Sequence, residues 1–271
     1  MKYMKRIAAL LCALLMLVSP ACADYASSID DVYDSYRSNN RSADTVYQQM
    51  VNGTYRTFEL GYLIAGHLDT RGSYSSTIDS IYDSYRSNNR SADNVYHQIV
   101  NGTYRSFEIM YVVANLLDTK GSYSSTIESI YDTYKSNNRS ADTVYQQMAN
   151  GTYRTFEIMY VIANLLDTKG SYSSTIDSIY DSYKSNNRSA DNVYHQIVNG
   201  TYRSFEIGYV IANLLDTSGL YESMIDSIYD NYKSNNRSAD NVNQQMVNGM
   251  YRTFEIMYVA AQLWDMKSFS L

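Results

Sequence analysis

The sequence predicts an all-α protein, an α-solenoid of five tandem 49-residue repeats with two or three antiparallel helices per repeat, after a cleaved signal peptide. One unit, represented by residues 74–122, recurs five times head to tail without insertion. Its apolar residues recur every three or four positions, as on one face of a helix. The single proline lies in the leader, so no proline interrupts a helix in the repeats. We expect one domain over residues 24–271, with repeats at 25–73, 74–122, 123–171, 172–220 and 221–269.

Residues 1–23 are typical of a secretory signal peptide. A basic segment at residues 2–6 precedes an apolar segment at 7–18, and small residues follow it, which predicts cleavage before Asp24. The apolar segment is too short to span a bilayer, and no later segment is apolar for about 18 residues. We therefore expect a secreted protein, or one in the periplasm or cell envelope, without integral membrane insertion after cleavage.

Composition restricts the partners of the mature chain. Both cysteines, Cys12 and Cys22, lie in the leader, so the mature chain lacks disulfides, and acylation of Cys22 is the alternative form of processing. Without the leader, 19 basic and 28 acidic residues give a net charge of −9. An acidic chain argues against nucleic acid and anionic membrane surfaces as partners, because both select for basic patches.

The first element expected in each repeat is an amphipathic helix, placed in the second copy over residues 76–87. A serine precedes its apolar stripe as a candidate N-cap, and an Asn-Asn pair follows it. The stripe follows the i, i+3, i+4, i+7 pattern and consists of Ile78, Ile81, Tyr82 and Tyr85.

The remainder of the repeat is interpreted as two helices that break at Asn101-Gly102. The apolar spacing nevertheless continues through Gly102. The alternative is therefore one long helix that contains a glycine, at a cost of about 1 kcal/mol relative to alanine.

Such a unit cannot bury its apolar face alone, so we expect successive copies to stack. Atypical residues in the first and last copies indicate capping repeats. The C-terminal residues expected to form either a sealed cap or a self-associating end are Met250, Trp264, Met266 and Phe269. One site alternates between glycine and methionine, which indicates a position outside the tightly packed core: Gly61, Met110, Met159, Gly208 and Met257.

Tyrosine is the conspicuous residue, with 30 in the chain. Most tyrosines at helical spacing are expected to be core or boundary residues. Others are candidates for repeated partner-binding positions, since tyrosine and arginine are enriched at interfaces. Arg105 and Glu108 are expected to pair on a solvated helix face. The candidate partner-binding positions are Tyr55, Tyr104, Tyr153, Tyr202 and Tyr251, with Arg56, Arg105, Arg154, Arg203 and Arg252, and also Tyr47, Tyr96, Tyr145 and Tyr194.

No catalytic, cofactor or metal site is predicted. The three histidines, His67, His97 and His195, are too dispersed to share an ion, and no nucleophile-base set is marked by the sequence. The protein is therefore expected not to be an enzyme. We interpret it as an exported helical repeat scaffold that binds a protein or peptide. The alternatives are a self-associating structural protein of an extracellular or envelope assembly, and a glycan-binding module.

Overall fold

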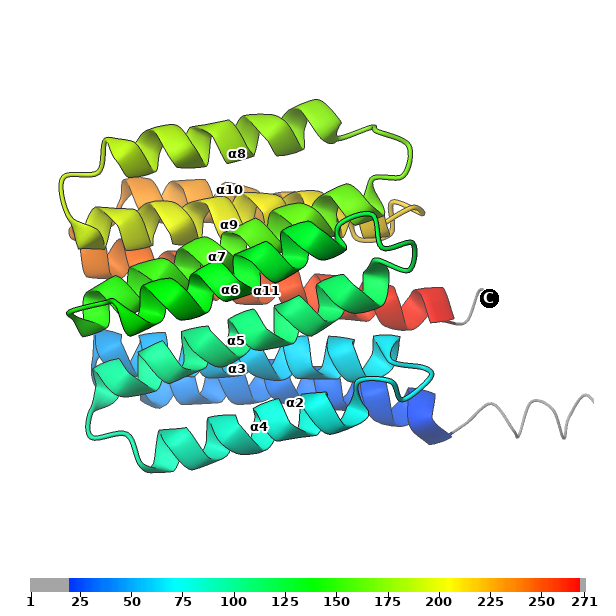
Figure 1. Cartoon of the computed structure of the whole chain (residues 1–271), viewed down its shortest axis with the longest axis horizontal. Coiled ribbons are helices and arrows are strands. Elements are labelled where there is room, and N and C mark those ends of the chain that lie inside the picture. Colours follow the sequence, from blue (N-terminus) through cyan, green and yellow to red (C-terminus); the bar gives the residue numbers. More distant parts are fainter. Residues whose placement is uncertain (1–19, 269–271) are drawn as a thin grey trace, which may run out of the picture.

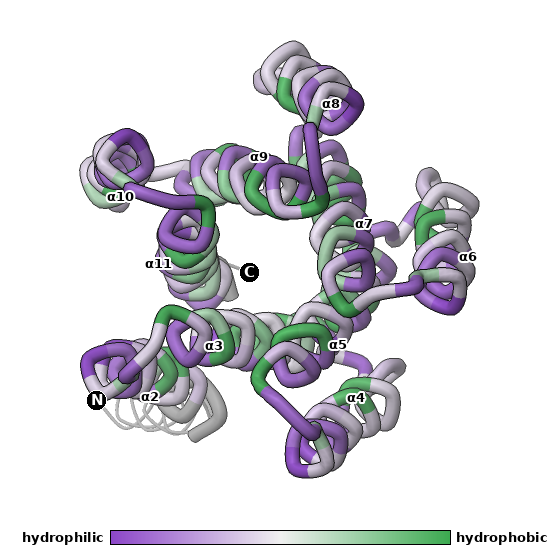
Figure 2. Tube along the Cα trace, turned by 90° about the vertical axis from the view of Figure 1, so that its left-hand side faces the viewer, coloured by the Kyte–Doolittle hydropathy of each residue, from purple (hydrophilic) through white to green (hydrophobic). Residues whose placement is uncertain are grey.

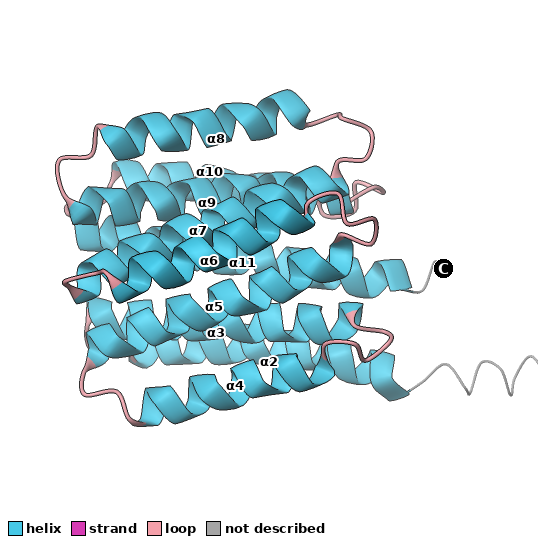
Figure 3. Cartoon of the chain, in the orientation of Figure 1, coloured by secondary structure: helices cyan, strands magenta, loops and turns pink. Residues whose placement is uncertain are grey.

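The computed structural model describes residues 20–268, with side chains from 25 to 266, and this range is helical throughout apart from short connections (Figures 1 and 3). The predicted all-α class is confirmed. Residues 1–19 of the predicted leader, and Phe269, lie outside the described residues. The helices are α2 (Pro20–Ser42), α3 (Val46–Leu68), α4 (Ser75–Arg90), α5 (Val95–Leu117), α6 (Ser124–Arg139), α7 (Val144–Leu166), α8 (Ser173–Arg188), α9 (Val193–Leu215), α10 (Glu222–Arg237) and α11 (Val242–Ser268).

The five helix pairs form a closed ring (Figure 2). Helices α3, α5, α7, α9 and α11 form an inner layer in which each packs against the next and α11 packs against α3. Helices α2, α4, α6, α8 and α10 form an outer layer, each packed on the inner helix of its own copy. The terminal copies therefore do not act as caps of an open solenoid, because the fifth copy packs against the first.

The closing contact repeats the contact between consecutive copies. Tyr36 of α2 stacks on Tyr251 of α11 with ring centroids 5.3 Å apart. Between the first and second copies, Tyr85 stacks on Tyr55 at 5.1 Å. Because equivalent tyrosine pairs form both contacts, the fifth copy meets the first through the same interface that joins consecutive copies.

Each repeat contains two helices, since α5 runs without interruption through Gly102. The predicted break at Asn101-Gly102 is wrong, and the structure gives both residues a packing role. The Asn101 amide donates to the Tyr85 backbone carbonyl at 3.1 Å, which fastens the inner helix to the outer helix of its own copy. A Cβ on Gly102 would lie 2.9 Å from Cβ of Thr54 in the preceding copy. Glycine thus permits neighbouring inner helices to approach closely.

The site that alternates between glycine and methionine is buried, contrary to the expectation. Met110 and Met159 are 5% and 2% exposed. A Cβ on Gly61 would lie 2.6 Å from Cγ2 of Ile109, and one on Gly208 would lie 2.8 Å from Cγ2 of Ile256. An isoleucine of the next copy therefore occupies the space that each glycine leaves, and the neighbouring methionines, Met110 and Met159, lie farther away.

Side chains fill the axis of the ring. Five apolar residues, one from each inner helix, form a buried cluster across it: Met50, Ile99, Met148, Ile197 and Met246. One helical turn or more further along, small threonine and serine side chains leave a cavity of about 80 Å³, lined by residues that include Thr54, Thr103, Thr152 and Thr201. The five clustered side chains thus fill the centre of the ring, which looks open in the backbone tube of Figure 2.

An aspartate at the end of each of the first four inner helices positions the next outer helix. Asp118 accepts the backbone N–H of Ser122 through Oδ1 and that of Tyr123 through Oδ2, both at 2.8 Å. Gly121, with φ of +68°, allows the chain to turn between them. The connection is repeated after α3, α7 and α9, so the start of each following outer helix is fixed by two hydrogen bonds.

Candidate functional site

The first set of predicted partner-binding residues lies in the seams between copies. In the third copy, Tyr153 stacks on Tyr183 of the fourth at 4.9 Å. The Arg154 guanidinium lies 4.3 Å from the Tyr153 ring centroid and pairs with Glu157 three residues later. The predicted Arg–Glu pairing is confirmed, but the face is not solvated, because both side chains are only 11% exposed. The equivalent stacked pairs are Tyr55–Tyr85, Tyr104–Tyr134, Tyr202–Tyr232 and Tyr251–Tyr36.

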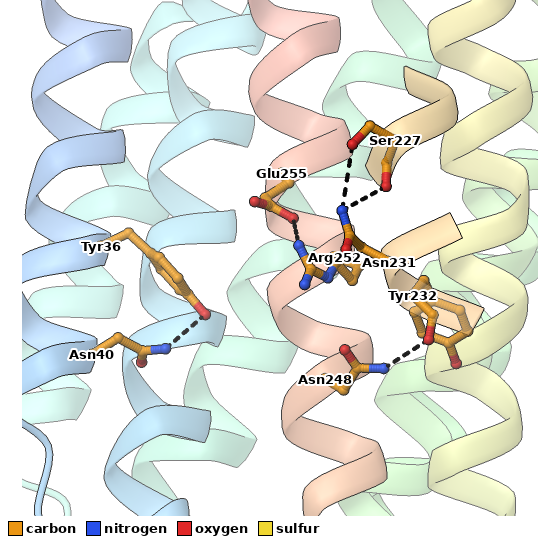
Figure 4. Close-up of polar contacts among 8 residues, drawn as sticks. All are labelled: Tyr36, Asn40, Ser227, Asn231, Tyr232, Asn248, Arg252 and Glu255. Atoms are coloured by element: carbon orange, nitrogen blue, oxygen red, sulfur yellow. Dashed lines mark hydrogen bonds and ion pairs between the residues drawn. The ribbon is translucent and has the colours of Figure 1, made fainter. Parts of the chain in front are cut away.

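Burial also sets the electrostatics of each seam. Desolvation raises the pKa of Tyr153 to about 12, and the adjacent Glu157 contributes to this shift. Figure 4 shows the corresponding ion pair of the fifth copy, Arg252 with Glu255. Each seam arginine leaves its Nε–H buried without a partner: Arg56, Arg105, Arg154, Arg203 and Arg252. Each seam therefore contains a net-neutral, largely buried ion pair whose arginine retains one unused N–H donor.

A groove runs along the outside of the ring between consecutive outer helices. Helices α6 and α8 do not contact each other, and α7 forms the floor between them (Figure 2). One hollow of about 350 Å³ in this groove is lined by residues that include Ser125, Ser129 and Thr133 of α6, Arg154, Glu157 and Tyr160 of α7, and Tyr180 of α8. A second hollow of about 300 Å³ is lined by residues that include Asn137, Gln146, Asn150, Tyr153, Asn187 and Gln196. Both volumes fall in the range of ligand-binding clefts.

The groove offers hydrogen-bonding groups beside aromatic rings. The Tyr160 hydroxyl donates to Asp177 of α8 at 2.9 Å, so the floor is tied to the next outer helix. Hydroxyl and amide groups line the walls, and the only charged groups among the lining residues of these hollows are Arg154 and Glu157. Such a surface suits a peptide backbone or a polar side chain. Within the described residues, no group of three or more side chains could hold a metal ion.

The second predicted set forms a collar around the axis, at the end where the inner helices begin. The rings of Tyr47 and Tyr96 are 5.1 Å apart, and those of Tyr145 and Tyr194 are 4.8 Å apart. Asn243, which stands at the tyrosine position in the fifth copy, donates to the Tyr47 hydroxyl at 3.4 Å. Hydrogen bonds from Tyr145 and Tyr47 lower the pKa of Tyr96. The structure therefore brings these residues together in a series of hydrogen bonds that runs from Asn243 to Tyr194.

The predicted role of most tyrosines is confirmed, since every tyrosine from 25 to 258 is buried or half-buried. The groove walls were missed by the sequence analysis. Ser125, Ser129 and Thr133 recur at i, i+4 and i+8 on the side of α6 away from its apolar stripe, which is the one sequence signal for them. That signal does not separate a groove wall from an ordinary solvated face.

Comparisons found no protein-family model, curated protein or solved structure that matches the chain. None of the described helices combines the length and the apolar character that crossing a membrane requires.

Proposed function

We propose that the protein is an exported helical ring that binds a protein or peptide partner in the grooves between its outer helices. The observation that carries this proposal is the 350 Å³ hollow between α6 and α8, in which the predicted Arg154 lies beside a row of hydroxyl groups. The groove is not filled by another element of the described chain. We propose a binding role and not a catalytic one, because the one acid that lines this hollow, Glu157, is paired with Arg154.

Repetition makes the groove suitable for a partner with several binding segments. The seam contacts recur in all five copies, including the closing one. When one segment is bound, the others are held close to the remaining grooves, which raises their effective concentration. Weak individual contacts can thus give a stable complex.

The proposed location is outside the cytoplasm, as a secreted or envelope protein. The basic and apolar segments of residues 2–18 support it. The first described core residue is Tyr25, so cleavage before Asp24 would remove no described core residue.

A peptide-display selection on residues 24–271 tests the groove. Random peptides would be selected for binding to the native chain. Their affinity would then be measured for a variant with S80W, S129W, S178W and S227W, whose tryptophans project from the walls and obstruct the grooves. A matched control would carry tryptophan at Ser87 and Ser136, which are exposed on the outer helices. We expect selected peptides to lose binding to the groove variant and to keep binding to the control. Selected peptides that bind both variants equally would contradict the proposal.

Self-association is the second candidate, favoured by an exposed apolar pair at the junction of the fourth and fifth copies. Leu220 is 65% exposed and Met224 is 45% exposed, whereas the three earlier junctions between copies carry serine and threonine at these positions. Light scattering over a hundredfold concentration range would show a mass that grows with concentration. Replacement by the residues of the other copies, L220S with M224T, should return the mass to one chain. A constant mass for the native chain would exclude this candidate. A glycan-binding role requires an open row of tyrosine rings, and the described tyrosines do not form one.

A further inference from the structure

The seam between the last and first copies contains an aspartate without its usual partners. Asp265 is the fifth-copy counterpart of Asp69, Asp118, Asp167 and Asp216, each of which accepts two backbone N–H groups from the connection that follows. Asp265 instead lies within α11, so the described residues give it no following connection. Its side chain is buried at 7% exposure, and its Oδ1 has no hydrogen-bond partner.

The missing donor can be identified from the other four copies. Oδ1 of the aspartate always accepts the N–H of the residue that immediately precedes the N-cap tyrosine: Ser73, Ser122, Ser171 and Leu220, at 2.8 to 3.0 Å. The counterpart of these residues in the first copy is Asp24, and the counterpart of the N-cap tyrosine is Tyr25.

The closing contact places Asp24 on the correct side of Asp265. The Tyr258 hydroxyl donates to Asp30 at 2.8 Å, and this pair is the counterpart of Tyr160 with Asp177 at 2.9 Å. Helix α2 therefore packs against α11 as α8 packs against α7. The start of α2 and the end of α11 lie at the same end of the ring in Figure 1.

While the leader is attached, the backbone N–H of Asp24 cannot donate to Asp265 as the N–H of Ser122 donates to Asp118. The other outer helices begin at the residue after the N-cap tyrosine, for example at Ser75, whereas α2 begins at Pro20, ahead of Tyr25. A helix that begins at Pro20 directs the N–H of residue 24 along its own axis, toward the carbonyl of residue 20. Oδ1 of Asp265 thus lacks the backbone donor that its counterparts have.

We propose that removal of the leader completes the ring, because it creates an α-ammonium group on Asp24 that binds the Asp265 carboxylate. Hydrolysis of the Ala23–Asp24 peptide bond by a signal peptidase consumes one water, leaving a carboxylate on the leader and an amine, protonated at neutral pH, on Asp24. An ammonium has three donors and a full charge, where the other copies supply a neutral N–H. This inference rests on the export and the cleavage position proposed above.

The surroundings of Asp265 support a cationic partner. Burial raises the pKa of the Asp265 carboxyl, and His67 opposes this shift in part. Tyr25 stacks on His67 with ring centroids 4.3 Å apart, and its hydroxyl is buried without a partner. His67 and Tyr25 are the titratable groups that face Asp265 from α3 and α2. A carboxylate in such a site is stabilised by an adjacent positive charge.

A thermodynamic cycle on residues 24–271 tests the proposal. One chain begins at Asp24 and a second carries Gly-Ser before Asp24, which displaces the ammonium group, and each is made with and without D265N. We expect the extension to lower the melting temperature by about 2 to 4 °C when Asp265 is present and to have no effect with D265N. We also expect D265N to destabilise the chain that begins at Asp24 and to leave unchanged, or stabilise, the extended chain. Equal effects of the extension in both backgrounds would overturn the proposal.

A second measurement reports on the ammonium group itself. NMR titration should show an α-amino pKa above its ordinary range in the chain that begins at Asp24, and a return to that range with D265N. D118N is the matched control, because it removes an equivalent carboxylate that has only backbone partners, and it should leave the α-amino pKa raised. An ordinary α-amino pKa in the chain that begins at Asp24 would overturn the proposed Asp24–Asp265 contact without bearing on export. An exported protein whose N-terminal residue is not Asp24 would overturn that contact and leave the proposed export standing.

Discussion

Replacing Tyr36 with alanine tests whether the ring is closed. In an open solenoid the outer face of the first copy has no neighbour, so the Tyr36 side chain would lie at a free end. In the closed ring of helices this side chain is 1% exposed, and it stacks on Phe254 of the last copy with ring centroids 4.2 Å apart. The substitution therefore removes a core side chain in one architecture and a terminal side chain in the other.

The expected magnitude follows from an internal seam of the same chain. Tyr134 is also 1% exposed, and it stacks on Phe107 at 4.4 Å. Truncation of a fully buried aromatic residue to alanine costs about 3 to 5 kcal/mol. We expect this loss for Tyr134→Ala and a loss of equal size for Tyr36→Ala, although 98 residues separate the two positions along the chain.

Urea unfolding followed by far-ultraviolet circular dichroism measures both losses in parallel. The m-values should agree, because the same surface is exposed on unfolding. A loss below about 1 kcal/mol for Tyr36→Ala, together with about 3 to 5 kcal/mol for Tyr134→Ala, would refute ring closure. Unequal m-values would show that the terminal copies unfold separately from the rest.

Three further predictions concern packing, ionisation and repeat number. Gly151→Ala should destabilise the chain in urea unfolding, because its Cβ would lie 2.6 Å from Cγ2 of Thr103, whereas Gly66→Ala has nothing within 4 Å and should stabilise by up to about 1 kcal/mol. The pKa of Tyr153 is raised in the folded chain, so stability should be complete below about pH 10 and fall as pH rises toward 12, which an absorbance titration of tyrosinate would show as ionisation coupled to unfolding. Deletion of residues 123–171 leaves four copies that do not close with the native geometry, so light scattering should show association or circular dichroism a broadened transition, and a monomer with native cooperativity would contradict this.

The helical class and the repeat could be predicted from local pattern alone. The period and the apolar spacing of Ile78, Ile81 and Tyr85 depend only on the chain itself, and these three residues are buried in the structure. The continuity of α5 through Gly102 could not be predicted in this way, because a glycine marks equally well a helix end and a close contact. Only the neighbouring Thr54 decides between the two.

The candidate site was predictable in part. The periodic recurrence of Tyr153 and Arg154 identified a repeated aromatic and cationic pair, and the structure shows that this pair forms a seam at the groove floor. Ring closure could not be predicted, since it depends on the small rotation between copies, which accumulates over five steps. The same limitation concealed the relation of Asp24 to Asp265, two residues at opposite ends of the chain.

The closed seam also restricts how the gene can change. The copies are similar in sequence, so recombination between them can add or remove 49 residues in frame. An open array tolerates such changes, because each added unit simply lengthens it. Here every copy advances the chain by about one fifth of a turn, and a chain of four or six copies leaves its ends apart or makes them collide. Selection on folding alone would therefore hold the copy number at five.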